Sequence, residues 1–204
     1  MRRTFAPRAG NRCAWFLSAG VSDGGPGGVS LVTNDGGSGG ALSFFPAGSL
    51  GFADPKSDLS VNGRKFKLER TLKKLINDIV AKPNGAFALA NSFNAGQQRA
   101  YYASPISIPF GGSFFGLGNT LSNFEIEDES DDYVGLFANV TASGILSGVR
   151  VENVVVRAGG GQSMVGSLVG RNLGSVINSS SGGNVQGVST AGGLVGWNTG
   201  TVSR

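Results

Sequence analysis

Two segments near the end of the chain share one pattern at a fixed spacing. Residues 166–176 read GSLVGRNLGSV and residues 192–202 read GGLVGWNTGTV, so the second copy begins 26 residues after the first. A looser relative begins at Gly135-Leu136-Phe137 and continues at Gly144-Ile145-Leu146. Repeats of about 20 to 50 residues are typical of solenoids and arrays. The repeat therefore constrains the fold more than any other feature of the sequence.

The length of the repeat favours one kind of solenoid. A four-stranded propeller blade needs about 40 residues, and the repeat has no helical periodicity. Its short strands fit one coil of a parallel β-helix, in which neighbouring coils about 4.8 Å apart pair their backbone groups. A lone coil could not bury its aliphatic side chains, so the coils must stabilise one another.

A coil of this kind assigns a role to each repeated position. We expect Leu168 and Val176 to point inward, Gly170 and Gly174 to occupy corners with positive φ, and Asn172 to cap backbone groups at a bend. The next coil would place equivalent residues directly above them, at Leu194, Asn198 and Val202. The chain stops just after the second copy, which leads us to expect a fragment of a longer array.

Composition agrees with an all-β chain and excludes several functions. The 204 residues include 35 glycines, yet 40% are hydrophobic, which favours many short strands and tight turns over disorder. The absence of histidine removes the commonest general base and metal ligand. The charge of +4 comes from scattered side chains, so we expect no nucleic-acid partner. No apolar run approaches the roughly 20 residues that span a bilayer, so we expect no membrane insertion by this segment.

The chain divides into three expected parts. Residues 1–40 are interpreted as an irregular glycine-rich segment with one short strand candidate at 29–32, and residues 1–20 only vaguely imitate a signal peptide. Residues 41–100 form a β-rich lead-in, in which Asn62-Gly63 predicts a hairpin. Residues 101–204 contain the β-helix coils with the repeats.

One segment of the lead-in has helical periodicity. Apolar residues recur at spacings of three and four, and lysines fill the opposite face; they are Leu68, Leu72, Leu75, Ile76, Ile79 and Val80. This pattern predicts a single amphipathic helix near residues 69–81, ending before Lys82-Pro83. We interpret it as a helix packed on the β-domain, with a membrane-surface or calmodulin-like role as the alternative.

Three features of the sequence are candidate sites. The acidic cluster at 125–132 is interpreted as a solvated loop between strands, with calcium binding as the alternative. Trp197 is interpreted as a tolerated corner residue, with contact to sugar or protein as the alternative. The glycosylation sequons at Asn139 and Asn178 are expected to be incidental. Cys13 is the only cysteine and cannot close an internal disulfide.

The segment GLVGWNTGTV at 193–202 resembles the GLUG-motif repeats of large bacterial surface and secreted proteins, including filamentous-haemagglutinin-like adhesins. The segment FFGLGNTLSNF at 114–124 is similar to the stretch that precedes the first such repeat, and GAFALA at 85–90 is similar to the lead-in. The resemblance implies a right-handed parallel β-helix, export and adhesion. It implies no catalytic, cofactor-binding or metal-binding residues.

Our leading hypothesis is a non-enzymatic adhesin-like module, secreted or on the bacterial cell surface, that serves as a stalk or attaches to a surface. Its expected partners are a host or surface glycan or protein receptor and outer-membrane export machinery. The alternative is a β-helical carbohydrate-active enzyme, a polysaccharide lyase or hydrolase, because fold does not fix function. Hydrolysis usually needs two carboxylates about 5 to 10 Å apart, and outside the acidic cluster only Glu152 lies near the repeats. A third hypothesis is a structural spacer whose binding site lies elsewhere in a longer parent chain.

Overall fold

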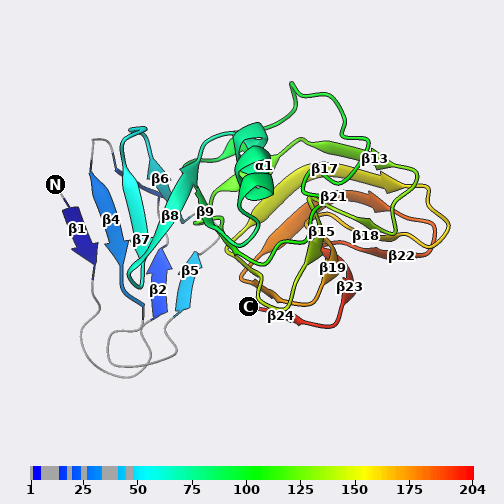
Figure 1. The fold of residues 1–204 in the computed structure, drawn as a ribbon. Coiled ribbons are helices and arrows are strands. Elements are labelled where there is room, and N and C mark those ends of the chain that lie inside the picture. Colours follow the sequence, from blue (N-terminus) through cyan, green and yellow to red (C-terminus); the bar gives the residue numbers. More distant parts are fainter. Residues whose placement is uncertain (1, 6–13, 18–19, 24–26, 34–40, 45–47) are drawn as a thin grey trace.

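The computed structural model describes residues 2–5, 14–17, 20–23, 27–33, 41–44 and 48–204. It is a parallel β-solenoid of about six turns with one short helix (Figure 1). The predicted β-helix with a single helix is therefore confirmed. In the described part of the chain, every pair of strands is parallel except the pair formed by β7 (Asp58–Val61) and β8 (Arg64–Glu69).

Residues 86–204 wind as successive coils whose strands stack into four sheets. The first sheet continues from β8 through β9 (Ala86–Leu89), β11 (Ser113–Phe115), β16 (Ile145–Ser147), β20 (Ser175–Ile177) and β24 (Thr201–Ser203). The second contains β10 (Phe93–Asn94), β12 (Thr120–Ser122), β13 (Glu125–Asp128), β17 (Arg150–Ala158) and β21 (Ser180–Gln186). The third contains β14 (Tyr133–Val134), β18 (Met164–Gly166) and β22 (Thr190–Gly192). The fourth contains β15 (Phe137–Val140), β19 (Val169–Asn172) and β23 (Val195–Asn198).

The two repeat copies lie on top of each other, as the sequence predicts. Val169 pairs with Val195, and Val176 pairs with Val202. The amide of Leu168 donates to the carbonyl of Leu194 at 3.1 Å. Leu168 and Val176 are buried, as expected of inward positions.

The looser copy occupies the preceding coil. Phe137 pairs with Val169 and Leu146 pairs with Val176, although this coil is longer than the next. Part of the difference in coil length lies in the second sheet, where the register of β17 against β21 shifts between Val151 and Val154. The register of the first and fourth sheets is thus kept while the length of the coil changes.

The corners of the coils are not where the sequence analysis placed them. Gly170 and Gly174 do not have positive φ, and this expectation is corrected. A β-carbon at Gly170 would lie 2.6 Å from the amide nitrogen of Val134, and one at Gly174 would lie 2.3 Å from the carbonyl oxygen of Gly144. Neighbouring backbone, not a left-handed turn, therefore requires glycine at both positions.

The left-handed residues form two other ladders that run from coil to coil. They are Gly118, Gly148 and Asn178 before the second sheet, and Asn123 and Asn153 within it, followed in the next coil by Gly183, the register partner of Val154. Glycine and asparagine are the residues that tolerate this conformation best. Their alignment shows that the bends on either side of β12 recur in the coils that follow.

The first half of the chain also forms stacked strands. The strands β1 (Arg2–Phe5), β4 (Gly28–Leu31) and β7 pair in parallel, as do β2 (Ala14–Leu17) with β5 (Ala41–Phe44) and β3 (Gly20–Asp23) with β6 (Ser49–Phe52). The described part of residues 1–40 is thus not irregular but contributes β1–β4. Its strands pair with strands of residues 41–61.

The strand direction reverses at the predicted hairpin. Asn62 and Gly63, which join antiparallel β7 and β8, have φ values of 50° and 78°. Two consecutive positive φ values are the geometry that an Asn-Gly turn favours. Because β8 then pairs in parallel with β9, coils of opposite strand direction share one continuous nine-stranded sheet.

The helix α1 (Leu72–Ala81) lies against residues of the first coil of the C-terminal solenoid (Figure 1). It begins later than residue 69 because Glu69 ends β8 and Thr71 is the N-cap, which accepts a hydrogen bond from the amide of Lys74 at 3.3 Å. Its buried side chains, Leu72, Leu75 and Ile79, belong to the main hydrophobic core. The helix therefore covers apolar surface that a preceding coil would otherwise cover.

The strand β9 separates two hydrophobic cores. Phe87 and Leu89 face the core inside the C-terminal solenoid, whereas Ala88 joins a second core shared with the N-terminal strands. This second core also contains Leu50 and Leu117, whose amide and carbonyl are hydrogen-bonded at 2.9 Å. Strands buried on both faces are expected to be apolar throughout, as the sequence AFAL of β9 is.

Candidate functional site

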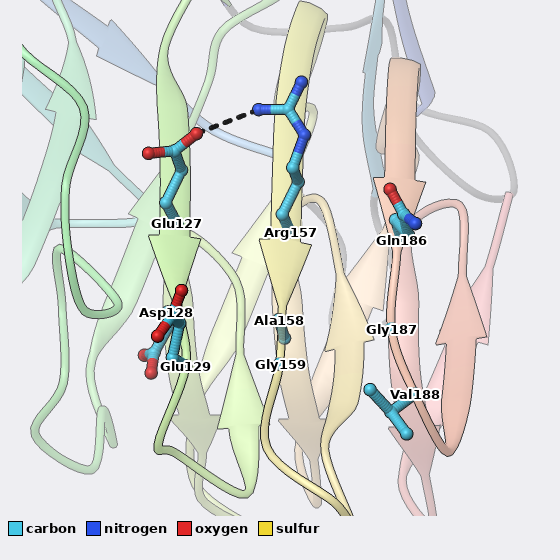
Figure 2. A pocket seen from close by; sticks show the side chains of 9 residues that line it. All are labelled: Glu127, Asp128, Glu129, Arg157, Ala158, Gly159, Gln186, Gly187 and Val188. Atoms are coloured by element: carbon cyan, nitrogen blue, oxygen red, sulfur yellow. Dashed lines mark hydrogen bonds and ion pairs between the residues drawn. The ribbon is translucent and has the colours of Figure 1, made fainter.

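A groove of about 410 Å³ lies at the ends of three neighbouring strands of the second sheet (Figure 2). Its lining comes from β13, β17 and β21 and the residues that follow them, namely Glu127, Asp128, Glu129, Arg157, Ala158, Gly159, Gln186, Gly187 and Val188. We call it the acidic groove. Three of the carboxylates of the 125–132 cluster therefore line one hollow on the surface.

A single arginine pairs with one of these carboxylates, Glu127, and with the neighbouring Glu125. Glu127 and Arg157 are register partners on β13 and β17, and Figure 2 shows their side chains meeting across the strands. Nη1 of Arg157 lies 3.0 Å from Oε1 of Glu127 and 2.5 Å from Oε1 of Glu125. All three side chains are more than 40% exposed, so each pair contributes at most about 1 kcal/mol to stability.

Asp128 is directed into the backbone of the turn that follows β13. It is buried, and its Oδ1 accepts hydrogen bonds from the amides of Ser130 and Asp131, both at 3.0 Å. The hydrogen bond with Asp128 raises the pKa of Asp131, as do burial and the nearby charges of Asp128 and Asp132. Asp128 therefore stabilises the turn through its hydrogen bonds to the backbone.

The acidic cluster differs from the solvated loop that the sequence analysis favoured. Residues 125–128 form β13, in which Ile126 is fully buried between partly exposed glutamates. Only 129–132 lie between β13 and β14. Among the residues that the structure describes, no group of three or more carboxylates, histidines or cysteines is arranged to hold a metal ion. The calcium alternative thus gains no support from the geometry.

A second cluster lies on the third and fourth sheets. The guanidinium carbon of Arg171 on β19 is 5.3 Å from the ring centre of Tyr133 on β14 and 4.9 Å from that of Trp197 on β23. The two rings are nearly parallel, at 25°, with centres 6.4 Å apart. We call these three partly exposed side chains the outer stack. It combines aromatic rings and an arginine, which are enriched at protein interaction surfaces.

Trp197 was expected at a corner, but it lies within β23. It is the register partner of Arg171, which in turn pairs with Asn139 of β15. Nε of Arg171 and Oδ1 of Asn139 are both buried without a hydrogen-bond partner in the described structure. The repeat itself contained the signal for this cluster, because Arg171 and Trp197 occupy the same position of its two copies.

The repeated asparagines form an internal ladder, as predicted. Nδ2 of Asn172 donates to Oδ1 of Asn198 at 2.7 Å, and Oδ1 of Asn172 accepts from the amide of Gly174 at 3.1 Å. Asn172 is completely buried, so these bonds satisfy groups that water cannot reach. The ladder supports the bend between the fourth and first sheets; its member Asn172 lies in the interior, whereas Asn198, in the last coil, is exposed.

Asn178, the other predicted sequon, holds the two halves of the chain together. Its Nδ2 donates to Oγ of Ser43 at 2.9 Å, and its own backbone is left-handed. The nearby Arg150 donates to the carbonyl oxygen of Phe44 at 3.4 Å. These four residues line a second groove of about 460 Å³ together with Glu152, Ser179, Ser180 and Arg204. Glu152 therefore lies in a different groove from Glu127.

The chain has a sequence relative among known proteins. The chain is 31% identical to halomucin from Haloquadratum walsbyi over 144 residues, which cover 71% of this chain but 2% of halomucin. No family model matches the chain, and no solved structure matches it. Within the described residues, no helix is long and apolar enough to cross a bilayer.

Proposed function

We propose that this chain is a non-enzymatic, adhesin-like β-solenoid module of a secreted or cell-surface protein, of the class that contains GLUG-motif and filamentous-haemagglutinin-like repeats. The observation that carries the proposal is the in-register stacking of the coils, which turns a short repeat into a rod that displays side chains at fixed intervals. A stalk needs a rigid rod, and attachment needs an outer surface on which side chains recur.

The similarity to halomucin supports a surface location, since its name denotes a mucin-like protein. The matched segment is a small part of that protein, so its properties reach this chain only as part of the proposal. Export through outer-membrane machinery and recognition of a glycan or protein receptor complete the proposal. Nucleic acid is not among the proposed partners.

The outer stack is the surface that we assign to attachment. Tyrosine, tryptophan and arginine are the side chains that most often dominate binding energy at interfaces. Tyr133, Arg171 and Trp197 come from three consecutive coils, so a ligand bound there would lie along the axis of the solenoid. Either a glycan or an extended polypeptide could follow this line.

A binding measurement with matched variants tests the assignment. The purified chain is applied to immobilised mucin, mixed glycans and intact cells, and Trp197→Ala and Arg171→Ala are expected to weaken binding about tenfold or more. Arg157→Ala, in the acidic groove, is the control and is expected to bind as the parent does. Absence of binding, or equal binding by all variants, would reject the outer stack as the attachment surface.

The enzymatic alternative rests on the acidic groove. A hydrolase would need a carboxylate free to act as a general acid, whereas Glu125 and Glu127 are both paired with Arg157. We therefore expect no cleavage when the chain is incubated with a panel of acidic and neutral polysaccharides. Cleavage that disappears in Glu127→Gln or Glu129→Gln would replace the adhesin proposal with a carbohydrate-active enzyme.

A further inference from the structure

Glu69, the last residue of β8, carries a buried carboxyl group. Its side chain has no exposed surface. In the described structure, neither Oε1 nor Oε2 has an N–H or O–H partner. An ionised carboxylate in such a place is strongly unfavourable unless it is paired, and the usual outcome is that it takes up a proton.

The group beside Glu69 is another carboxyl, that of Asp78 on α1. Oδ2 of Asp78 lies 2.7 Å from Nζ of Lys67 and 2.8 Å from Nζ of Lys74. Two ammonium groups thus hold Asp78 as the ionised member of the pair. A carboxyl and a carboxylate in contact are stable when one proton lies between them and repel when it is lost.

The charged groups around Glu69 come from two elements. Lys67 lies on β8 itself, and Lys74 and Asp78 lie on α1. The other neighbour of this end of β8 is β9, whose residues Ala86–Leu89 contain no titratable side chain. The ionisation of Glu69 therefore acts on the junction between β8 and α1.

We propose that Glu69 and Asp78 form a proton-dependent latch that fastens α1 over the end of the C-terminal solenoid. Protonated Glu69 donates a hydrogen bond to the Asp78 carboxylate. Loss of the proton leaves two carboxylates facing each other beside buried apolar side chains, and α1 loosens from the end of the solenoid. Leu72, Leu75 and Ile79 are the core residues that such loosening would expose.

The pKa shifts of the two groups agree with this geometry. Burial, followed by the hydrogen bond to Asp78 and its charge, raises the pKa of Glu69 to about 7, against the opposing charges of Lys74 and Lys67. For Asp78, burial acts to raise the pKa, but the hydrogen bonds from Lys67, Lys74 and Glu69 outweigh burial and lower the pKa to about 2. The proton of the pair is therefore held by Glu69, and Asp78 stays ionised.

The direction of the pH effect follows from these shifts. The ordinary pKa of Glu69 is 4.5, so between 4.5 and about 7 the folded chain binds more protons at this site than the unfolded chain. The contribution of Glu69 to the attachment of α1 is therefore fully present below pH 4.5, weakens as the pH rises through this interval, and is lost above about 7. Asp78 acts in the opposite direction only between about pH 2 and 3.8.

Hydrogen exchange of the α1 amides tests the latch in the whole chain. After correction for the intrinsic exchange rate, protection of these amides is expected to fall about 10- to 100-fold between pH 5 and pH 8. Glu69→Gln keeps the shape and a hydrogen-bond donor but cannot ionise, so its protection should be nearly independent of pH. Glu125→Gln, at a partly exposed glutamate remote in sequence from α1, should retain the pH dependence of the parent.

A carbon-13 NMR titration of the Glu69 side chain gives an independent result, because it needs no variant. A midpoint near 7 supports the latch, and a midpoint near 4.5 overturns it. Constant protection of α1 in the parent chain, or an unchanged pH dependence in Glu69→Gln, also overturns it.

Discussion

The two ends of the C-terminal solenoid differ in what covers them. At the first coil, α1 lies on the core, and its Leu72, Leu75 and Ile79 are completely buried. At the last described coil, equivalent positions become exposed. The register partners Leu146, Val176 and Val202 are exposed by 0%, 1% and 46%, respectively.

This difference shows where the stability of the solenoid arises. The side chains in the ladder have the same aliphatic character and the same register, yet only those with a coil on both sides are fully buried. Burial of a valine or leucine contributes about 1.5 to 3 kcal/mol, and the contribution falls with the area left exposed. The helix therefore substitutes for a coil at one end. The contribution of each aliphatic side chain to stability depends on the coils that lie next to it along the axis.

The largest expected effect is at the covered end. Leu75→Ala removes a completely buried side chain of α1 and leaves a cavity between the helix and the first coil. We expect it to lower the free energy of unfolding by about 2 to 5 kcal/mol, measured by chemical denaturation. Val80→Ala, on the exposed face of the same helix, is the control and should change it by less than about 0.5 kcal/mol. Equal effects of both changes would mean that α1 is not packed as a cap.

The next effect compares two positions of one ladder. Val176→Ala should cost about 2 kcal/mol because this side chain is buried between coils, whereas Val202→Ala should cost less than about 1 kcal/mol. The same chemical change is made in both variants, so the difference isolates the contribution of the neighbouring coil. A larger loss at Val202 would contradict the stacking order.

The smallest effect concerns the asparagine ladder. Asn172→Ala removes the bonds to Asn198 and Gly174 from a buried site and should destabilise the chain by about 1 to 2 kcal/mol. Asn198 is exposed, so Asn198→Ala should cost about half as much or less. Thermal unfolding of the two variants side by side gives the comparison. If Asn198→Ala were the more damaging change, the ladder would not be internal.

The sequence predicted the coils well because the spacing of the repeat equals the number of residues between stacked positions. Residues 26 apart, such as Asn172 and Asn198, are hydrogen-bonded neighbours. The helix was also predicted, since its apolar spacing is local, although its start was placed before the Thr71 N-cap. The Asn62-Gly63 hairpin was predicted for the same reason: its signal lies in two adjacent residues.

Features that depend on neighbouring coils were predicted poorly. Gly170 and Gly174 look like turn glycines, yet the backbone of the adjacent coil is what excludes a side chain there. The strands among residues 2–31 have no recognisable repeat, so their parallel pairing could not be predicted from spacing. For the candidate sites, the sequence marked the acidic cluster and Trp197, but not Arg157 or Tyr133. Both of these form their contacts only after the coils stack.

Cross-linking between coils tests the central claim most directly. With Cys13 replaced by serine, cysteines at the register partners Ser175 and Thr201 should lie about 5 Å apart between α-carbons and form a disulfide readily under mild oxidation. Cysteines at Ser175 and Ser203 lie on the same strands but two residues out of register, at about 8 Å, and should cross-link far more slowly. Rapid closure of the first pair and slow closure of the second is the predicted result. Equal rates, or faster closure of the second pair, would contradict the stacked register on which the fold and the proposed function depend.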